Sequence, residues 1–506
     1  MNTKGKIVNF RPLLFIGLIL IIGILISSLT IFYKFSYSVI LLSVLLISLI
    51  WVLIFSLKGK NYKIFISVIV SIILLILGVF SFYNAKSKYD SANYSADAYL
   101  KGYVTEIKSN DNNYSQIVVK ADINNLTNKI IVEIPAKYKV YVGNKIEFKC
   151  EVYKNYYSYN GKFNLYPLIN NEYYYATNVE NVRVYREFDG VISKLKYKII
   201  TLLQKYMPNG YGFSYALLVG DTSYLKGDSI LGFRYTGVAH IFAVSGLHVG
   251  FLYGFLKLAL KILKVKKKPS IMIILSLIFL YVWFCGFSPS CLRAFYIILF
   301  VSLSEILDFK YDKISVLFLS AILILLINPL YLFDLGFLLS FAAYSSIILL
   351  TRPISRWFSK FLPDKIAKHL APYISAYLGV MPISISSFGY YSAFSMLFNM
   401  IIVPIISVVY VLNFIAVVGL LISTHLGFLC ILPEISFVFI TKFITSINYY
   451  AFLLKEIDLG LSTFFYYLML IMMLDEINIS TKIRKNMIYS LFIVFIVSVF
   501  VINLGN

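Results

Sequence analysis

The stretch GVAHIFAVSGLHVG, residues 237–250, places a serine and two histidines in a chain that is otherwise dominated by apolar residues. A serine with a histidine in reach is typical of an activated nucleophile, and histidine is a common metal ligand. Polar residues inside a membrane, by contrast, mark substrate and ion pathways. Ser245, His240 and His248 are therefore candidates for a serine hydrolase, a metal site or the lining of a passage.

Helix geometry favours the lining of a passage. On an unbroken helix at about 100° per residue, Ser245 and His248 lie roughly 60° apart, and we expect their side chains to point outward in parallel rather than at each other. His240 joins them only if the helix breaks near Ser245. Because no carboxylate is nearby in sequence, we expect neither a metal nor another cofactor. The other face carries three glycines spaced for close helix packing, Gly246, Gly250 and Gly254.

The composition is that of a polytopic α-helical membrane protein. The 506 residues are 59% hydrophobic and 14% charged, with a mean hydropathy of +0.80, whereas a soluble domain has about 25% charged residues. The net charge of +22 falls largely in short loops, where the positive-inside rule places basic residues. The net charge alone therefore says little about binding partners. The four cysteines lack C-x-x-C spacing, so neither a zinc ribbon nor a thioredoxin-like motif is expected.

Apolar runs orient the first part of the chain. Residues 1–82 contain three runs at 12–32, 36–57 and 64–82, each about as long as the roughly 20 helical residues that cross a bilayer. Basic residues at the N-terminus and at 58–63 belong in the cytoplasm, so the third helix exits outward. The length of the first run and the spans after it indicate a retained anchor rather than a signal peptide.

A second apolar block predicts a transmembrane domain over 237–480 and a last helix within 481–506, which brings the total to about thirteen spans. The run at 394–424 is long and contains Pro404 after Asn399, which allows a broken or kinked helix beside a cavity. The expected spans are 238–262, 270–287, 291–307, 314–328, 331–350, 369–388, 394–424, 434–454, 462–475 and 487–503.

Between the two blocks, residues 83–190 change to short stretches of alternating polar and β-prone residues separated by Asn, Asp and Gly. Five or six strands in about a hundred residues predict a small β-barrel outside the cell, of which the OB-fold is a common five-stranded type. Tyrosines crowd this domain. They either stack nucleic-acid bases or fill the barrel core, and the candidates for DNA contact are Tyr156, Tyr157 and Tyr159.

Residues 191–236 begin with a helical pattern that is too charged to span a membrane. Its apolar residues recur opposite lysines, which predicts an amphipathic helix on the outer leaflet. Lys194 and Lys198 are candidates for steering a polyanion, although a plain interfacial anchor is the simpler explanation of the helix.

A second polar cluster is GFSPSCLRAF, residues 286–295. Ser288 before Pro289 is typical of a helix start, with the serine as N-cap. Arg293 then lies about one turn inside the membrane, where phosphate is the natural partner for an arginine beside a helix N-terminus. Alternatively Arg293 extends to the surface or pairs with Asp334, at another outward helix start.

Five segments carry a resemblance to a known family. They occur in order over residues 215–410: YALLVGDTSYL, GVAHIFAVSGLHVG, GFSPSCLRA, NPLYLFDLGFLLSFAA and MPISISSFGYYSAFSMLFNMIIVPI. The chain resembles the ComEC family of competence membrane proteins, and the arrangement of N-terminal spans and β domain is similar too. The resemblance implies a multi-pass channel in the bacterial cytoplasmic membrane that admits single-stranded DNA during natural transformation. It also implies two partners, a DNA receptor outside and a cytoplasmic ATPase or helicase.

On this interpretation the translocation path gathers polar residues near the outer mouth: Asp221, His240, Ser245, His248, Ser290, Arg293, Asp334, Ser340 and Asn399. No G-x-x-x-x-G-K-[ST] occurs, so the energy must come from outside the chain. We therefore expect a transport channel rather than an enzyme. The alternatives are an intramembrane hydrolase that uses Ser245 and His248, or a transporter of another polyanion or a lipid-linked precursor.

The chain departs from the family in one respect. Many members continue into a metallo-β-lactamase-like domain, thought to degrade the strand that is not imported, and no H-x-H-x-D-H occurs here. We expect a short member without that domain, which leaves strand degradation to a separate nuclease.

Overall fold

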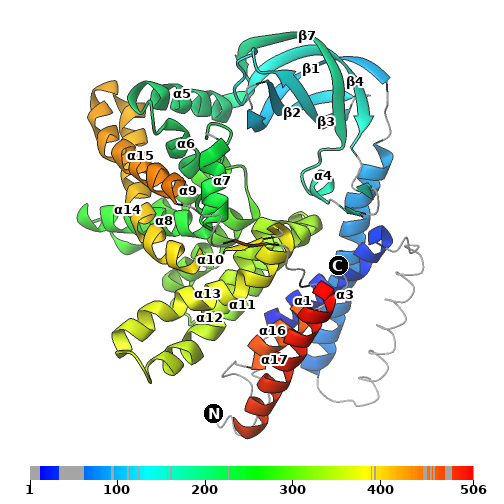
Figure 1. Cartoon of the computed structure of the whole chain (residues 1–506), viewed down its shortest axis with the longest axis vertical. Coiled ribbons are helices and arrows are strands. Elements are labelled where there is room, and N and C mark those ends of the chain that lie inside the picture. The colour runs from blue at the N-terminus through cyan, green and yellow to red at the C-terminus, as the bar shows by residue number, and fades with distance from the viewer. Residues whose placement is uncertain are drawn as a thin grey trace.

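The structure is a computed structural model that describes residues 12–32, 62–92, 96–472 and 481–504. The expected second span, 36–57, lies outside the described residues. The described elements form a helical block with a β-barrel against one end of it (Figure 1). Within the third range the undescribed residues are 111–112, 124–125, 156–157, 160–161, 164, 226, 243, 389, 393–394, 448–452, 456–458 and 460–461.

Two N-terminal helices, α1 (Pro12–Phe32) and α3 (Tyr62–Ser91), pack side by side. They approach closely at Gly23, where an added Cβ would lie 2.7 Å from the carbonyl oxygen of Leu75. Both helices lie where the sequence predicted apolar helices, over residues 12–32 and 64–82. The helix α3 continues beyond the expected end at residue 82 and leads the chain into the barrel.

Five strands close a barrel in the order β1, β2, β3, β7, β4. The pair β3 and β7 is parallel and the other pairs are antiparallel. Apolar side chains fill the interior, for example Ile117, Ile130 and Phe148, each 0% exposed. The barrel is therefore a packed core and not a pore. The strands are β1 (Ala96–Asn110), β2 (Tyr114–Ile123), β3 (Leu126–Pro135), β4 (Asn144–Lys154) and β7 (Tyr174–Phe188).

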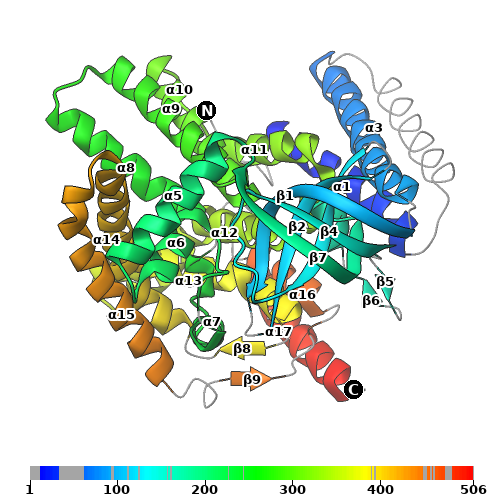
Figure 2. The same ribbon diagram turned by 90° about the horizontal axis from the view of Figure 1, so that it is seen from above.

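Three short elements connect β4 to β7, namely β5 (Ser158–Tyr159), β6 (Lys162–Phe163) and the helix α4 (Tyr166–Ile169). The barrel lies between α3 on one side and α5 on the other when the molecule is seen from above (Figure 2).

The amphipathic helix expected after the barrel is α5 (Gly190–Tyr206). Its apolar face, which includes Ile200 and Leu203, is buried, whereas Lys194 and Lys198 are exposed. Two short helices follow, α6 (Tyr211–Val219) and α7 (Gly227–Tyr235).

The remaining elements build the helical block, in which β8 and β9 pair at one edge (Figure 2). Their bounds are η1 (Ala239–Ile241), α8 (Gly246–Ile262), α9 (Lys267–Phe284), α10 (Pro289–Ile306), α11 (Lys313–Ile327), η2 (Pro329–Phe333), α12 (Leu335–Phe358), α13 (Asp364–Phe388), β8 (Tyr390–Ser392), α14 (Ser395–Ile422), η3 (Thr424–Cys430), α15 (Ile431–Ser446), β9 (Leu453–Lys455), α16 (Ser462–Met472) and α17 (Thr481–Leu504).

Five described helical segments are long and apolar enough to cross a membrane, which is consistent with a membrane protein that carries a β domain. The total of about thirteen spans stays a prediction, because several further apolar helices are shorter. The five segments are Lys267–Phe284, Pro289–Ile306, Leu335–Phe358, Ser395–Ile422 and Thr424–Ser446.

Two details of the expected spans are corrected. The run 238–262 is not one helix, because α8 begins only at Gly246, after a 3-10 turn and an extended Ser245. The run 394–424 is not broken at Pro404, since α14 continues through it. A proline removes one backbone hydrogen bond, and packed membrane helices tolerate that loss.

Candidate functional site

The first turns of three helices meet inside the helical block. The helices α8, α10 and α12 begin directly after Ser245, Ser288 and Asp334, which are their N-cap residues. The hydroxyl of Ser290 in α10 donates to the carbonyl oxygen of Gly336 in α12 at 3.0 Å. Helix starts that the sequence separates by about 45 residues each are therefore neighbours in space.

Arg293 joins all three helices. It is 8% exposed, and its Nη1 donates to the carbonyl oxygen of Ser340 in α12. Its Nη2 lies against Gly246 at the start of α8, so closely that a Cβ there would overlap it. The Nε atom has no hydrogen-bond partner among the described residues. The guanidinium group also lies over two aromatic rings, 5.3 Å from Tyr344 and 6.0 Å from Phe341.

Asp334 does not neutralise Arg293. Its carboxylate caps α12 by accepting from the backbone N–H of Phe337 at 2.8 Å. No ion pair between Asp334 and Arg293 occurs, although the structure describes both residues. The alternative in which these two charges pair is therefore not realised, and the arginine stays a cation held by a carbonyl and by aromatic faces.

Ser245 and His248 contact each other, and the expectation that they point outward in parallel is wrong. Ser245 has an extended backbone, so its side chain folds over the first turn of α8 and accepts from the N–H of Leu247 at 3.2 Å. His248 Nδ1 accepts from the backbone N–H of Ser245 at 3.1 Å and lies 3.2 Å from its Oγ. The pair thus forms a capping box at the helix start.

His248 is 1% exposed, and its Nε2 has no partner among the described side chains. Its ring meets the edge of Tyr410 at 4.9 Å between centroids. His240 lies in η1 and is exposed. The helix break near Ser245, without which His240 cannot share a face with Ser245 and His248, is present, because α8 begins only at Gly246.

Asn399 and Asp221, two further residues expected on the path, have partners of their own. Asn399 donates to the carbonyl oxygens of Gly237 at 3.3 Å and Ser395 at 2.8 Å, and its buried Oδ1 has no partner in the described part of the chain. Asp221, in the loop after α6, accepts from the N–H of Ser223 at 2.9 Å. Burial raises the pKa of Asp221 above its usual range.

Of the three glycines on one face of α8, only Gly246 lies in close contact with another described helix. A Cβ on Gly246 would meet Arg293 and, at 3.5 Å, Ala294. A Cβ on Gly250 or Gly254 would meet no atom within 4 Å in the described structure. The close packing expected at these two glycines is therefore absent there, because this face of α8 turns away from its described neighbours.

The candidates for DNA contact are only partly described. Tyr156 and Tyr157 lie outside the described residues, and Tyr159 belongs to β5. Lys194 and Lys198 project from the exposed face of α5. No group of three or more His, Cys, Asp or Glu that could hold a metal ion occurs in the described portion of the chain.

Sequence reasoning missed the aromatic surroundings of the site. Tyr344 follows Ser340 by four residues and so shares its helix face, which is a signal that the sequence offered. Tyr410, which is 1% exposed beside His248, gave no local signal because it lies more than 160 residues away along the chain.

Comparisons with known proteins concern this part of the chain. The model of a family described as "Competence: Competence protein" matches residues 217–477. ComE operon protein 3 of Bacillus subtilis (strain 168) is 30% identical over 233 residues, which are 46% of this chain and 29% of that protein. An uncharacterized protein of Aquifex aeolicus (strain VF5) is 27% identical over 174 residues, 34% of this chain and 39% of the other. The matches thus span well under half of either relative, and no solved structure matches.

Proposed function

Because the chain belongs to the competence protein family, we propose that it is a membrane channel for DNA uptake that passes single-stranded DNA across the cytoplasmic membrane. The observation that supports this most is the meeting of three helix starts around the buried Arg293.

This arrangement favours phosphate. Each helix N-terminus carries a partial positive charge. The starts of α8 and α10 lie beside Arg293, which forms no ion pair with a carboxylate of the described residues, whereas the carboxylate of Asp334 offsets the charge at the start of α12. The Nε of Arg293 has no acceptor among the described residues, so it can donate to a phosphate. A phosphodiester needs only a few such donors to pass, and tighter binding would stall the strand. Asp221, His240, Ser245, His248, Ser290, Asp334, Ser340 and Asn399 complete the proposed path.

The barrel suits the approach of DNA rather than its passage. We assign it to the OB type, which its closed five-stranded form and parallel β3–β7 pair support. Since its interior is packed, the strand must pass beside the barrel. Tyr99, Tyr114 and Tyr153 expose about half of their surface and offer faces for base stacking, whereas Tyr173 and Tyr174 are buried and fill the fold.

The remaining steps are assigned to partners. We propose that the barrel faces outside, where a DNA receptor delivers the substrate, and that a cytoplasmic ATPase or helicase supplies the pull. A separate nuclease would degrade the second strand. The family membership supports these assignments, and the basic loops on the opposite side of the spans support the orientation.

The experiment is uptake of labelled DNA by a strain that lacks this gene and carries variants of it. We expect no uptake without the gene and strongly reduced uptake with Arg293→Met, at unchanged protein level in the membrane. Arg352→Met is the matched control, because Arg352 lies on α12 but is exposed. Normal uptake in the deletion strain would refute the DNA channel and favour another polyanion or a lipid-linked substrate.

A second measurement tests the phosphate contact itself. Each phosphate contact to a single strand steepens the dependence of log affinity on log salt by about 0.7. Binding of an oligonucleotide to the purified full chain should therefore lose roughly that slope in Arg293→Met and keep it in Arg352→Met.

A further inference from the structure

A polar junction joins the barrel to the N-terminal helix α3. Asn155, directly after β4, donates from Nδ2 to the carbonyl oxygen of Glu172 at 3.0 Å, and the hydroxyl of Tyr89 in α3 donates to the carbonyl oxygen of Asn155 at 3.0 Å. Tyr89 is 2% exposed. The segment that carries α4 is thus held at its end by both the barrel and α3.

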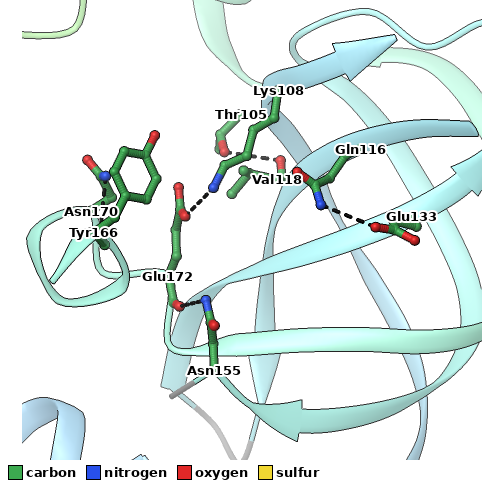
Figure 3. A network of polar contacts seen from close by, with 9 residues as sticks. All are labelled: Thr105, Lys108, Gln116, Val118, Glu133, Asn155, Tyr166, Asn170 and Glu172. Carbon is green, nitrogen blue, oxygen red and sulfur yellow. Dashed lines mark hydrogen bonds and ion pairs between the residues drawn. The ribbon is translucent and has the colours of Figure 1, made fainter. Parts of the chain in front are cut away.

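A buried ion pair holds the same segment from the other side. Lys108 of β1 forms an ion pair with Glu172 (Figure 3). The distance between Nζ and Oε2 is 2.5 Å, and Glu172 is 0% exposed. The same ammonium group lies 4.6 Å from the centre of the Tyr166 ring at the start of α4. Lys108 therefore contacts both ends of the segment 166–172.

The helix α4 in turn packs on η2, the turn that precedes α12. Asn328 donates from Nδ2 to the carbonyl oxygen of Ile169 at 3.5 Å and caps η2 by accepting from the N–H of Leu330 at 3.1 Å. The turn η2 leads directly through Asp334 into α12. The first turns of α12 include the carbonyl of Ser340, which holds Arg293.

We propose that Lys108 and Glu172 are positioning residues for the mouth of the path. They hold α4 against η2, and η2 sets where α12 begins and where its carbonyl meets Arg293. The role of Arg293 in transport rests on the function proposed above, whereas the mechanical link from the barrel to α12 does not.

A buried ion pair is a costly way to gain stability, since desolvation of both charges offsets their attraction. Removal of one partner alone is far more harmful than removal of both, because it leaves an unpaired buried charge. If the ion pair of Lys108 and Glu172 stabilised only the barrel, its removal would change the barrel alone. A positioning pair also changes η2 and the start of α12, which belong to the helical block.

The test is hydrogen exchange of the full chain in lipid nanodiscs, followed in segments 165–173 and 328–340. We expect Lys108→Met to speed exchange of protected amides in both segments, on the order of a hundredfold for loss of one partner of a buried pair. Glu172→Gln should act less, because its amide still accepts from Lys108. The double variant, which leaves neither charge, should restore much of the protection.

The exposed pair of Lys145 and Glu187 is the matched control, since it joins β4 and β7 of the same barrel by 2.9 Å. Lys145→Met with Glu187→Gln should change neither segment. Faster exchange at 165–173 with unchanged exchange at 328–340 would overturn the proposal, as would equal effects of the control pair. If deletion of the gene leaves DNA uptake intact, the proposed transport function is refuted. Faster exchange in both segments of Lys108→Met would still support the mechanical link from the barrel to α12.

Discussion

At the scale of single residues, Ser245 and His248 form a contact that serves the start of a helix. The Nδ1 atom of His248 already accepts the backbone N–H of Ser245, so it has no free lone pair with which to take the hydroxyl proton. A catalytic histidine is normally oriented by a third group on its other nitrogen. The Nε2 of His248 has no such partner among the described residues.

Variants of Ser245 separate a cap from a nucleophile. Ser245→Ala removes the cap oxygen and should lower the free energy of unfolding by about 1 kcal/mol. Ser245→Asn keeps a cap oxygen but no nucleophile, so we expect near-normal stability and DNA uptake. Thermal unfolding of the full chain and labelled uptake are the measurements. Loss of activity in Ser245→Asn at normal stability would instead support the hydrolase.

The glycines of α8 offer a second contrast on one helix. Gly246→Ala forces the guanidinium group of Arg293 to move, because the new methyl group overlaps Nη2. We expect reduced DNA uptake and a loss of about 1–3 kcal/mol of stability, as is usual for overpacking. Gly250→Ala meets open space and should be neutral or stabilising by up to about 1 kcal/mol. Equal behaviour of the two variants would contradict the contact with Arg293.

The sequence predicted which residues carry charge into the membrane but not what they touch. Arg293 is conspicuous because it stands in an apolar run. Its partners Ser340 and Tyr344 are about 50 residues away on another helix, and no local pattern encodes that pairing. The error at Ser245 has a similar cause. The hydropathy of a segment does not reveal where a helix is capped. The serine side chain can hydrogen-bond to the backbone N–H groups of the residues after it, and so a serine before a glycine can begin a new helix.

At the scale of elements, α12 and α13 form a close pair. A Cβ on Gly379 of α13 would lie 2.6 Å from the Cβ of Ser346 and 2.9 Å from the carbonyl oxygen of Ala342. Small residues at such a crossing let two helix backbones approach. The sequence predicted both helices, because long apolar runs are reliable signals of spans, but their pairing depends on this local fit.

The variant Gly379→Ala tests that crossing. We expect a loss of about 1–3 kcal/mol of unfolding free energy, since the methyl group has no space. Ser346→Gly in the same chain should recover part of the loss by removing the side chain that it meets. Gly254→Ala, on an open helix face, is the control. Thermal unfolding in detergent measures all of these, and a failure of Ser346→Gly to rescue would place the strain elsewhere.

At the scale of the whole molecule, the sequence predicted a helical membrane protein with a β-barrel of five or six strands, and the long apolar helices and the five-stranded barrel of the structure are consistent with both parts. The barrel could be predicted because alternating strands and turn residues are local signals. The docking of α4 on η2 could not, because it joins segments about 160 residues apart through Asn328 and Ile169.

The orientation across the membrane gives the last prediction. The loop between α8 and α9 carries the dense lysine run that includes Lys266, and such loops usually lie inside, so we expect the barrel to lie outside. Lys139→Cys on the barrel should react with a membrane-impermeant maleimide in intact cells, and Lys266→Cys only after permeabilisation. Both variants are made in a Cys285→Ser parent, because Cys285 is only half-buried, and that parent alone is the control. Cys150, Cys291 and Cys430 are at most 2% exposed, and burial raises the pKa of the Cys150 thiol to about 12, which suppresses the reactive thiolate. Labelling of Lys266→Cys alone in intact cells would reverse the orientation and place both the barrel and the start of the proposed path in the cytoplasm.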